Sequence, residues 1–276
     1  MVATGFEEAT SVAYNPRIIG VALITTDLAR ACAFYEQALG FDRAGSGRYD
    51  SAEVATLRLG EETLHLIRPD RLGKAYPEPQ AANDPWFQHF AIAVSDAAAA
   101  FERLSRMPFT PISRDGPIQL PASSGSVIAY KFRDPDRHPL ELSQFPDDRW
   151  TRRRAPGPFL GIDHTAIAVA DLDLSLAFYS GTLGFDLTSR GVNAGPTQDA
   201  LDGLDGTRVE IVVLSAPSPQ GPHLELLHYV SPRPLKGPQP VRIEDVAASR
   251  TIITGDDLPS ATLRDPDGHI ITTQLW

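Results

Sequence analysis

Histidine and acidic side chains interrupt several otherwise apolar segments of this chain. His65 lies within residues 63–67, His89 within residues 87–94 and Glu141 within residues 139–144, and each segment has the alternating or apolar pattern of a short strand. Imidazole nitrogens and carboxylate oxygens are ligands of divalent metals. Taken singly, each histidine is more simply explained as a hydrogen-bonded side chain facing a polar cup, and Glu141 as an exposed carboxylate. Their relative positions must therefore decide whether they bind metal.

Other reactive side chains have simpler explanations. Cys32 is the one cysteine of the chain, so an internal disulfide or a thiolate metal cluster is excluded. No histidine is placed to activate it, which favours a buried structural thiol. The motif Arg-Asp-Pro-Asp occurs at residues 133–136 and 264–267, each time followed two residues later by histidine. Such motifs are typical of hairpin turns whose carboxylates bond their own backbone.

The charge balance argues against some partners. The chain has 25 Lys and Arg against 35 Asp and Glu, a net charge of −10 over 276 residues. A net-acidic chain without a long basic segment lacks the electrostatic attraction that nucleic acids require. No apolar run is long enough to span a membrane and no signal segment is recognisable, so we expect a soluble, cytoplasmic protein. At about 100–200 residues per domain, the length suggests two domains.

Two internal repeats reveal how these domains are built. Residues 27–42 match residues 171–186 at nine of 16 positions, and the Arg-Asp-Pro-Asp motifs form a second pair of matching segments. Each first repeat is preceded by an apolar strand, begins with a capping aspartate, continues with helical spacing and ends near a glycine. Further strand patterns follow downstream. The repeated unit is therefore βαβββ.

Four such modules are expected, near residues 17–69, 86–146, 159–230 and 243–276, and the last of them is truncated. We expect consecutive modules to pair into two domains, residues 17–148 and 158–276, with a linker at residues 147–158. The proline-rich connection over residues 107–125 is a candidate rim or lid of a binding cup.

The repeated pattern His-x-Ala-x-x-Val-x-Asp-Leu, Ala-Phe-Tyr and Leu-Gly-Phe, followed by Arg-Asp-Pro-Asp-x-His, resembles the vicinal oxygen chelate superfamily. That superfamily includes glyoxalase I, extradiol dioxygenases and bleomycin resistance proteins. The resemblance covers nearly the whole chain. It implies an α+β fold of tandem βαβββ modules, in which two pairs of modules each close into a cupped mixed β-sheet with flanking helices.

The resemblance also implies where metal ligands lie: at the start of the first strand and in the last strand of each module. In the first domain these positions hold Gly20, His65, His89 and Glu141. We therefore expect His65, His89 and Glu141 to bind a divalent ion such as iron, manganese, zinc or nickel in the first domain. Lys131 stands near the position where extradiol dioxygenases place a tyrosine. We expect it to act with Glu141 in catalysis or to bind an anionic substrate, unless it is only a solvated strand lysine.

In the second domain the same four positions hold His164, Glu225, Arg250 and Thr272. A guanidinium cannot bind a metal and a hydroxyl rarely does. This set is therefore predicted to be a vestigial site, in which Arg250 pairs with Glu225.

Two classes of function follow. The first is a metal-dependent enzyme that chelates a small oxygen-bearing substrate as a Lewis acid, with isomerase or lyase chemistry favoured slightly over extradiol ring cleavage. The alternative is a metal-free small-molecule binding protein of the bleomycin-resistance type. In either case the partner is a small molecule, and neither a nucleic acid nor a membrane is expected. A homodimer, with modules exchanged between chains, stays open.

Overall fold

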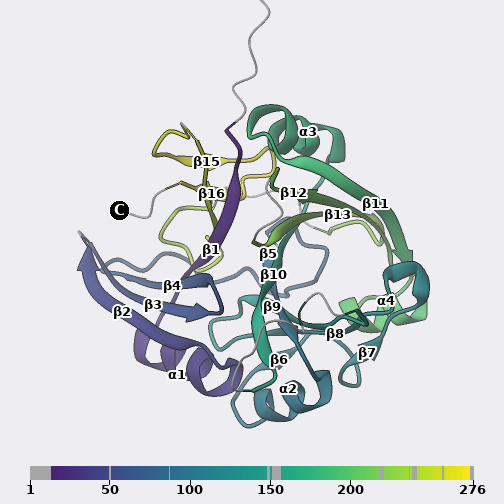
Figure 1. Ribbon diagram of the computed structural model, residues 1–276, viewed down its shortest axis with the longest axis horizontal. Helices are drawn as coiled ribbons and strands as arrows, with labels where there is room; N and C mark the ends of the chain where they lie inside the picture. Colours follow the sequence, from purple (N-terminus) through teal and green to yellow (C-terminus); the bar gives the residue numbers. More distant parts are fainter. Residues whose placement is uncertain are drawn as a thin grey trace, which may run out of the picture.

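The computed structural model describes residues 14–49, 51–86, 88–147, 150, 157–217, 221–235, 237, 241–256 and 258–273. Within them the chain forms two mixed β-sheets flanked by helices, the α+β arrangement expected from the repeats (Figure 1). Most of the linker predicted at residues 147–158 lies outside the described residues. No helix of the described part is both long and apolar enough to cross a lipid bilayer.

Sheet A is built from the first and last parts of the chain. Its strands are β1 (Arg17–Ile24), β2 (Asp42–Tyr49), β3 (Ala52–Leu59), β4 (Glu62–Pro69), β14 (Arg250–Thr254), β15 (Thr262–Arg264) and β16 (Ile270–Thr272). They lie in the order β15-β16-β14-β1-β4-β3-β2. Sheet A therefore combines the first module with the truncated fourth.

Sheet B is built from the middle of the chain. Its strands are β5 (Gln88–Val94), β6 (Thr110–Pro111), β7 (Ile118–Gln119), β8 (Ile128–Arg133), β9 (Pro139–Gln144), β10 (Phe159–Ala168), β11 (Asp186–Ala194), β12 (Arg208–Ser215) and β13 (His223–Ser231). Their order is β11-β12-β13-β10-β5-β9-β8-β6, with β7 paired to β8. Sheet B therefore combines the second and third modules.

This pairing corrects the expectation that consecutive modules share a sheet. β1 runs antiparallel to β14, and β10 runs antiparallel to β5. In each module the first strand lies parallel to a later strand of the same module. Its other edge pairs with the first strand of another module. In all four first strands most residues are buried, so local sequence does not select which edges meet. Long-range packing makes that choice.

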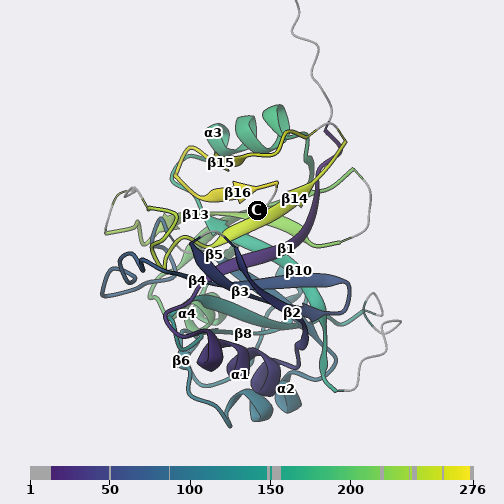
Figure 2. The ribbon, with the colours of Figure 1, turned by 90° about the vertical axis from the view of Figure 1, so that its left-hand side faces the viewer.

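The helices pack between and beside the sheets. They are α1 (Leu28–Leu39), α2 (Ala97–Leu104), η1 (Ala122–Ser124), α3 (Leu172–Leu176), its π-helical continuation η2 (Ala177–Thr182) and α4 (Pro196–Asp202). α1 begins at Asp27, which accepts a hydrogen bond from the Arg30 amide, and ends at Gly40 in a left-handed conformation. α1 and α2 lie side by side, while α3 lies at the far end of the molecule (Figure 1, Figure 2). One apolar core joins α1 and α2 to both sheets.

The fourth module is reduced, as the repeat predicts. Between β14 and β15 the described residues contain no helix. Ile253 of β14 and Ile271 of β16 instead pack with Ile18 and Tyr179 in a core shared with the third module. The helical segment of the third module thus covers strands of the fourth module, which lacks a helix of its own among the described residues.

The two Arg-Asp-Pro-Asp motifs link modules rather than perform chemistry. The Tyr35 hydroxyl donates to Asp134 Oδ2 at 2.8 Å, and His138 Nε2 lies 2.8 Å from the backbone oxygen of Ile24. Asp134 also accepts its own turn's backbone amides, as the motif predicts. The second copy repeats the two intermodule contacts. The Tyr179 hydroxyl donates to Asp265 Oδ2 at 3.1 Å, and His269 Nε2 lies 2.8 Å from the backbone oxygen of Ala168.

We expect Asp134→Ala to lower the free energy of unfolding by about 2–4 kcal/mol, because it leaves the buried Tyr35 hydroxyl and two turn amides without their acceptor. Denaturant unfolding measures this loss. Asp205→Ala is the matched control: its side chain is 90% exposed and pairs with Arg114 on the surface, so the change should stay within about 0.5 kcal/mol. Equal effects of the two substitutions would contradict the linking role.

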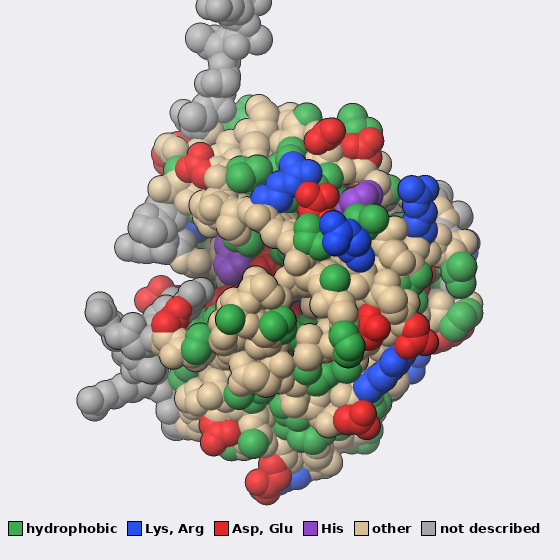
Figure 3. Space-filling model, turned by 90° about the vertical axis from the view of Figure 1, so that its right-hand side faces the viewer, with side chains coloured by type: hydrophobic (Ala, Val, Ile, Leu, Met, Phe, Trp, Pro, Cys, Tyr) green, Lys and Arg blue, Asp and Glu red, His purple; other side chains and the backbone are tan. Residues whose placement is uncertain are grey.

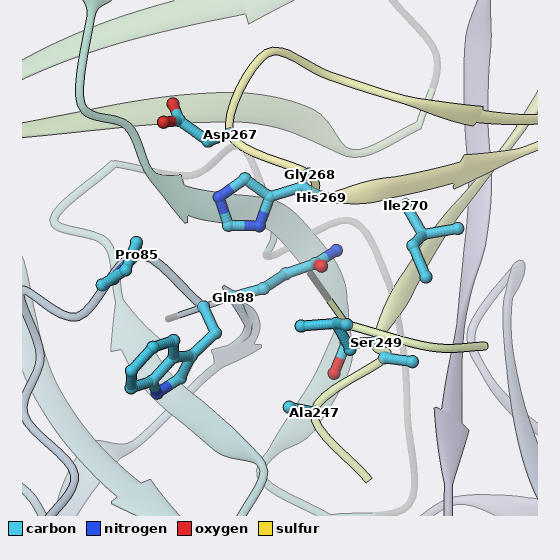
Figure 4. A pocket seen from close by; sticks show the side chains of 11 residues that line it. Pro85, Gln88, Ala247, Ser249, Asp267, Gly268, His269 and Ile270 are labelled. Atoms are coloured by element: carbon cyan, nitrogen blue, oxygen red, sulfur yellow. The ribbon is translucent and has the colours of Figure 1, made fainter. Parts of the chain in front are cut away.

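A small pocket lies where the second and fourth modules meet (Figure 4). The Gln88 side chain and the His269 ring enter it from opposite sides, with Ser249 beside them. Its volume is only about 20 Å³, enough for about one water molecule. This pocket is thus a small gap in the packing between the two modules.

Candidate metal centre

Four neighbouring strands of sheet B each present a possible metal ligand on the same face. Ala91 of β5 pairs with Glu141, and Ala166 of β10 pairs with both His89 and Glu225. Alternate residues of a strand share a face. His89, two residues before Ala91, and His164, two residues before Ala166, therefore point to the same side of the sheet as these alanines and their paired glutamates. The resulting group, called here the sheet B cluster, consists of His89 (β5), Glu141 (β9), His164 (β10) and Glu225 (β13).

The geometry of this cluster suits a single ion. His89 Nε2 lies 3.3 Å from Glu141 Oε2, and His164 Nε2 lies 3.8 Å from Glu225 Oε2. Ligand atoms of the first three members all lie within 4.8 Å of one another. Ligands about 2.0–2.2 Å from a shared ion stand up to about 4.4 Å apart, which is close to this spacing. His164 Nε2 is buried without a hydrogen-bond partner among the described residues. Such an imidazole nitrogen fits a metal ligand.

Opposite charges hold the cluster together. Burial opposes the charged form of His164, but Glu225 and Asp163 outweigh it and raise the pKa of His164 to about 9. Burial likewise opposes the charged form of Glu225, but His164 and His223 outweigh it and lower the pKa of Glu225 to about 2. Because a metal binds neutral imidazole, uptake of an ion at neutral pH must displace a proton from His164.

A β-bulge places a second carboxylate beside His164. The register of β10 against β5 shifts between Ile162 and His164, so Asp163 lines the same cavity as its neighbour. The His164 Nδ1–H donates to Asp163 Oδ2 at 2.9 Å, and Trp150 Nε1–H donates to Asp163 Oδ1 at 3.0 Å. An ionised carboxylate only accepts, so this bond leaves His164 Nε2 as the nitrogen available to a metal.

We expect Asp163→Asn to weaken metal binding about 10–100-fold, because the amide places an NH2 donor where one of the two oxygens accepted from His164 or Trp150, and the negative charge is lost. Calorimetric titration with Zn²⁺ or Ni²⁺ measures the change. Asp186→Asn, an exposed substitution at the start of β11, is the control and should leave the affinity unaltered. If both variants bind alike, Asp163 does not orient His164.

Lys131, expected to be catalytic, is a buried cation beside the cluster. Its Nζ lies 2.7 Å from Asp202 Oδ1 and 3.8 Å from Glu141 Oε2. Burial opposes the charged forms of both Lys131 and Glu141. The carboxylates of Asp202 and Glu141 nevertheless raise the pKa of Lys131, and His89 and Lys131 lower the pKa of Glu141. Lys131 is only 4% exposed, so its alternative interpretation as a solvated strand lysine is wrong.

His65 does not join His89 and Glu141, because β4 belongs to sheet A and β5 and β9 belong to sheet B. Its Nδ1 lies 3.1 Å from Thr56 Oγ1, and burial lowers the pKa of His65 to about 4. At Gly20 a Cβ atom would lie 2.3 Å from the backbone oxygen of Thr63, so that position has no room for a side chain. The predicted ligand set of the first domain is therefore divided between two sheets.

The set predicted to be vestigial is divided in the same way. Arg250 and Thr272 lie in sheet A, on β14 and β16, whereas His164 and Glu225 lie in sheet B. Arg250 Nη2 donates to the backbone oxygen of Ile243 at 2.7 Å, and the expected pair with Glu225 is not formed. His164 and Glu225 instead share one face of sheet B with His89 and Glu141.

The sheet B cluster lines a cavity of about 400 Å³, a size that suits a small molecule. Its walls combine polar and charged side chains with apolar ones such as Leu201, Ile211 and Val213. The connection over residues 107–125, expected to be a rim, contributes Leu120 and Ser124. On the face shown in Figure 3, the surface is hollowed where a histidine and acidic side chains are visible at depth.

Two residues that line this cavity, Asp163 and Gln198, were not singled out from the sequence as site residues, and neither was Asp202, whose buried carboxylate contacts Lys131 behind the wall. Gln198 and Asp202 lie on α4, which follows Gly195 and has Pro196 at its first position. Proline at the first helical position, with an aspartate in the first turn, is a recognisable start signal. The bulge that turns Asp163 inward has no comparable local signal.

The family model described as the Glyoxalase/Bleomycin resistance protein/Dioxygenase superfamily matches residues 17–142 and 161–272. No curated protein matches the chain. Among solved structures, glyoxalase I from Zea mays aligns with a TM-score of 0.61 and 18% identity over 93% of this chain and 91% of that chain. A mutant of the same enzyme gives a TM-score of 0.63 at the same identity and coverage. A putative dioxygenase from Bacillus subtilis aligns with a TM-score of 0.58 and 14% identity over 92% of this chain and 83% of that one. Identities this low reflect a shared fold.

Proposed function

Because the chain belongs to the glyoxalase/bleomycin resistance protein/dioxygenase superfamily, we propose that it is a metal-dependent enzyme acting on a small oxygen-bearing substrate in the cavity of sheet B. The observation that carries this proposal is the convergence of two imidazoles and two carboxylates, one from each of four adjacent strands. The ion would be held by His89, Glu141, His164 and Glu225.

The donor set supports a divalent first-row metal. Two nitrogens and two carboxylate oxygens leave positions for substrate oxygens in a six-coordinate site. A bound ion supplies Lewis-acid polarisation of a carbonyl or hydroxyl oxygen. The protein supplies a partly enclosed cavity around the cluster, in which electrostatic interactions near the reacting atoms are stronger than in bulk water.

We assign proton transfer to Glu225 and a mainly structural ligand role to Glu141. Ser143 Oγ donates to Glu141 at 2.7 Å, and Lys131 stands 3.8 Å away, so Glu141 is firmly held as a carboxylate. Glu225 is the more exposed of the two, and its hydrogen-bond contact is to His223 at 3.4 Å. A carboxylate with this freedom can take a proton from a carbon beside a carbonyl and return it to a neighbouring atom.

This division of roles favours isomerase or lyase chemistry over extradiol ring cleavage. A second carboxylate in the cluster provides a base that a proton-transfer reaction needs. Lys131, at the position expected for a tyrosine in the ring-cleaving relatives, is occupied by its contact with Asp202. We therefore place the reaction among proton transfers on substrates with two adjacent oxygen atoms.

The test begins with elemental analysis of protein purified without a metal-affinity tag. We expect about one divalent ion per chain and, after reloading of metal-depleted protein, turnover of a hemithioacetal made from methylglyoxal and a thiol. Oxygen consumption with catechols measures the competing ring-cleavage reaction. Metal-free protein that still binds small molecules would instead favour the binding-protein class, and catechol turnover would replace the isomerase assignment.

A further inference from the structure

Helix α4 is an addition to the third module that the first module lacks. In the first module β2 ends at Tyr49 and β3 begins at Ala52, whereas in the third β11 ends at Ala194 and β12 begins at Arg208. The longer connection contains α4, which lies against β7 and β8 of the second module.

This helix is fixed in place at the wall of the cavity. The Ser113 hydroxyl donates to the backbone oxygen of Leu201 at 2.8 Å, and the Arg114 amide donates to the backbone oxygen of Ala200 at 2.8 Å. Gly203 passes so close to Ile112 that a Cβ atom would lie 2.4 Å from its backbone oxygen. Two buried side chains of α4, Gln198 and Leu201, therefore line the cavity from a fixed position.

Asp202 of α4 determines how the neighbouring amide of Gln198 is oriented. Its buried carboxylate accepts from Lys131 Nζ at 2.7 Å, from Gln198 Nε2 at 2.8 Å and from the Tyr229 hydroxyl at 3.1 Å. An ionised carboxylate cannot donate, so the nitrogen end of the Gln198 amide must face Asp202. The oxygen end must then face away from it.

That oxygen is the feature that points to a ligand. Gln198 is 3% exposed and lines the same cavity as the sheet B cluster, yet its Oε1 atom has no hydrogen-bond partner among the described residues. Buried acceptors are almost always satisfied by a protein group, a water or a ligand. A donor that enters the cavity would satisfy this one.

We propose that Gln198 is the acceptor of a substrate-binding subsite on the α4 wall, which takes a neutral hydroxyl or amide N–H group of the substrate. The inference rests on the proposed function, in which the other end of the substrate bears the oxygens that meet the sheet B cluster. It narrows the substrate class to small molecules with a pair of oxygen donors at one end and a hydrogen-bond donor at the other.

The charges around the cavity favour a neutral group at this subsite. Four carboxylates stand at or behind the wall, against one lysine: Glu141, Asp163, Asp202, Glu225 and Lys131. A divalent ion and the lysine together leave one negative charge in excess. A substrate with an anionic far end would meet repulsion from this excess.

The test uses benzohydroxamic acid, which chelates divalent metals through two oxygens, and its 3- and 4-hydroxy and 3- and 4-hydroxymethyl derivatives. Their affinities are measured on Zn²⁺-loaded wild-type protein and on Gln198→Met, which retains side-chain length without the amide. We expect at least one derivative to bind wild type about three- to tenfold more tightly than the parent, and this gain to disappear in Gln198→Met.

Gln119→Met is the matched control, because the same change is made on the exposed strand β7, and the gain should persist. Zn²⁺ affinity itself should be equal in all three proteins. If the wild type takes up no metal, the proposed function fails. If metal and the parent compound bind but no derivative gains, or if the gain survives Gln198→Met, only the subsite is overturned.

Discussion

Replacing His164→Ala is expected to weaken binding of a divalent metal at least about 100-fold, more than the loss of a supporting hydrogen bond to a ligand typically does. The imidazole is buried, its Nδ1 is committed to Asp163, and its Nε2 faces Glu225 at 3.8 Å. Alanine removes one of the two imidazole ligands of the sheet B cluster. Calorimetric titration with Zn²⁺ or Ni²⁺, together with turnover after metal loading, measures the loss.

His65→Ala is the informative comparison, because the two histidines test two different ligand sets. If the metal is bound by sheet B, this substitution changes the affinity less than about twofold, since His65 lies in sheet A beside Thr56. A large loss in His65→Ala with little effect of His164→Ala would restore the ligand set predicted from consecutive modules and contradict the centre described above.

A second large effect is expected from Lys131→Met, which should lower the free energy of unfolding by about 3–5 kcal/mol. Lys131 and Asp202 form a buried contact of 2.7 Å, and Asp202 has a fully buried side chain. Removing only the cation leaves a buried carboxylate without its compensating charge, which is more damaging than removing both partners. Denaturant unfolding of the metal-free protein gives the value.

The double variant Lys131→Met with Asp202→Asn should recover about half of that loss or more, because the uncompensated charge is gone. Lys74→Met, at an exposed position, controls for the substitution itself and should stay within about 0.5 kcal/mol. A Lys131→Met protein of wild-type stability that has lost its turnover would instead support the catalytic role predicted for this lysine.

Much of the fold can be predicted from the chain because the modules carry strong local signals. Asp27 and Asp171 both cap helices, and the two Arg-Asp-Pro-Asp motifs both form turns with the same buried tyrosine contacts. These signals depend on residues close in sequence. They identify the βαβββ units and their truncation without any knowledge of which units meet.

The partnership of the modules could not be predicted in the same way. β1 can in principle pair through its free edge with β5 or with β14, and both candidates are short strands whose residues are mostly buried. The ligand positions within each module follow from the local pattern. Whether His89 joins His65 or His164 depends on a contact between distant segments, which no short motif encodes.

The exchange of partners between modules also has a consequence for the order in which the chain can fold. All strands of sheet B lie between Gln88 and Ser231, so this sheet can assemble as soon as that continuous segment is available. Sheet A must wait, because β1 finds its neighbour β14 only when the last part of the chain has been synthesised. Closing so long a loop carries a larger entropy penalty than closing the loops within sheet B. We therefore expect the half that holds the proposed catalytic centre to form first on the ribosome, with the edge of β1 exposed until β14 has been synthesised.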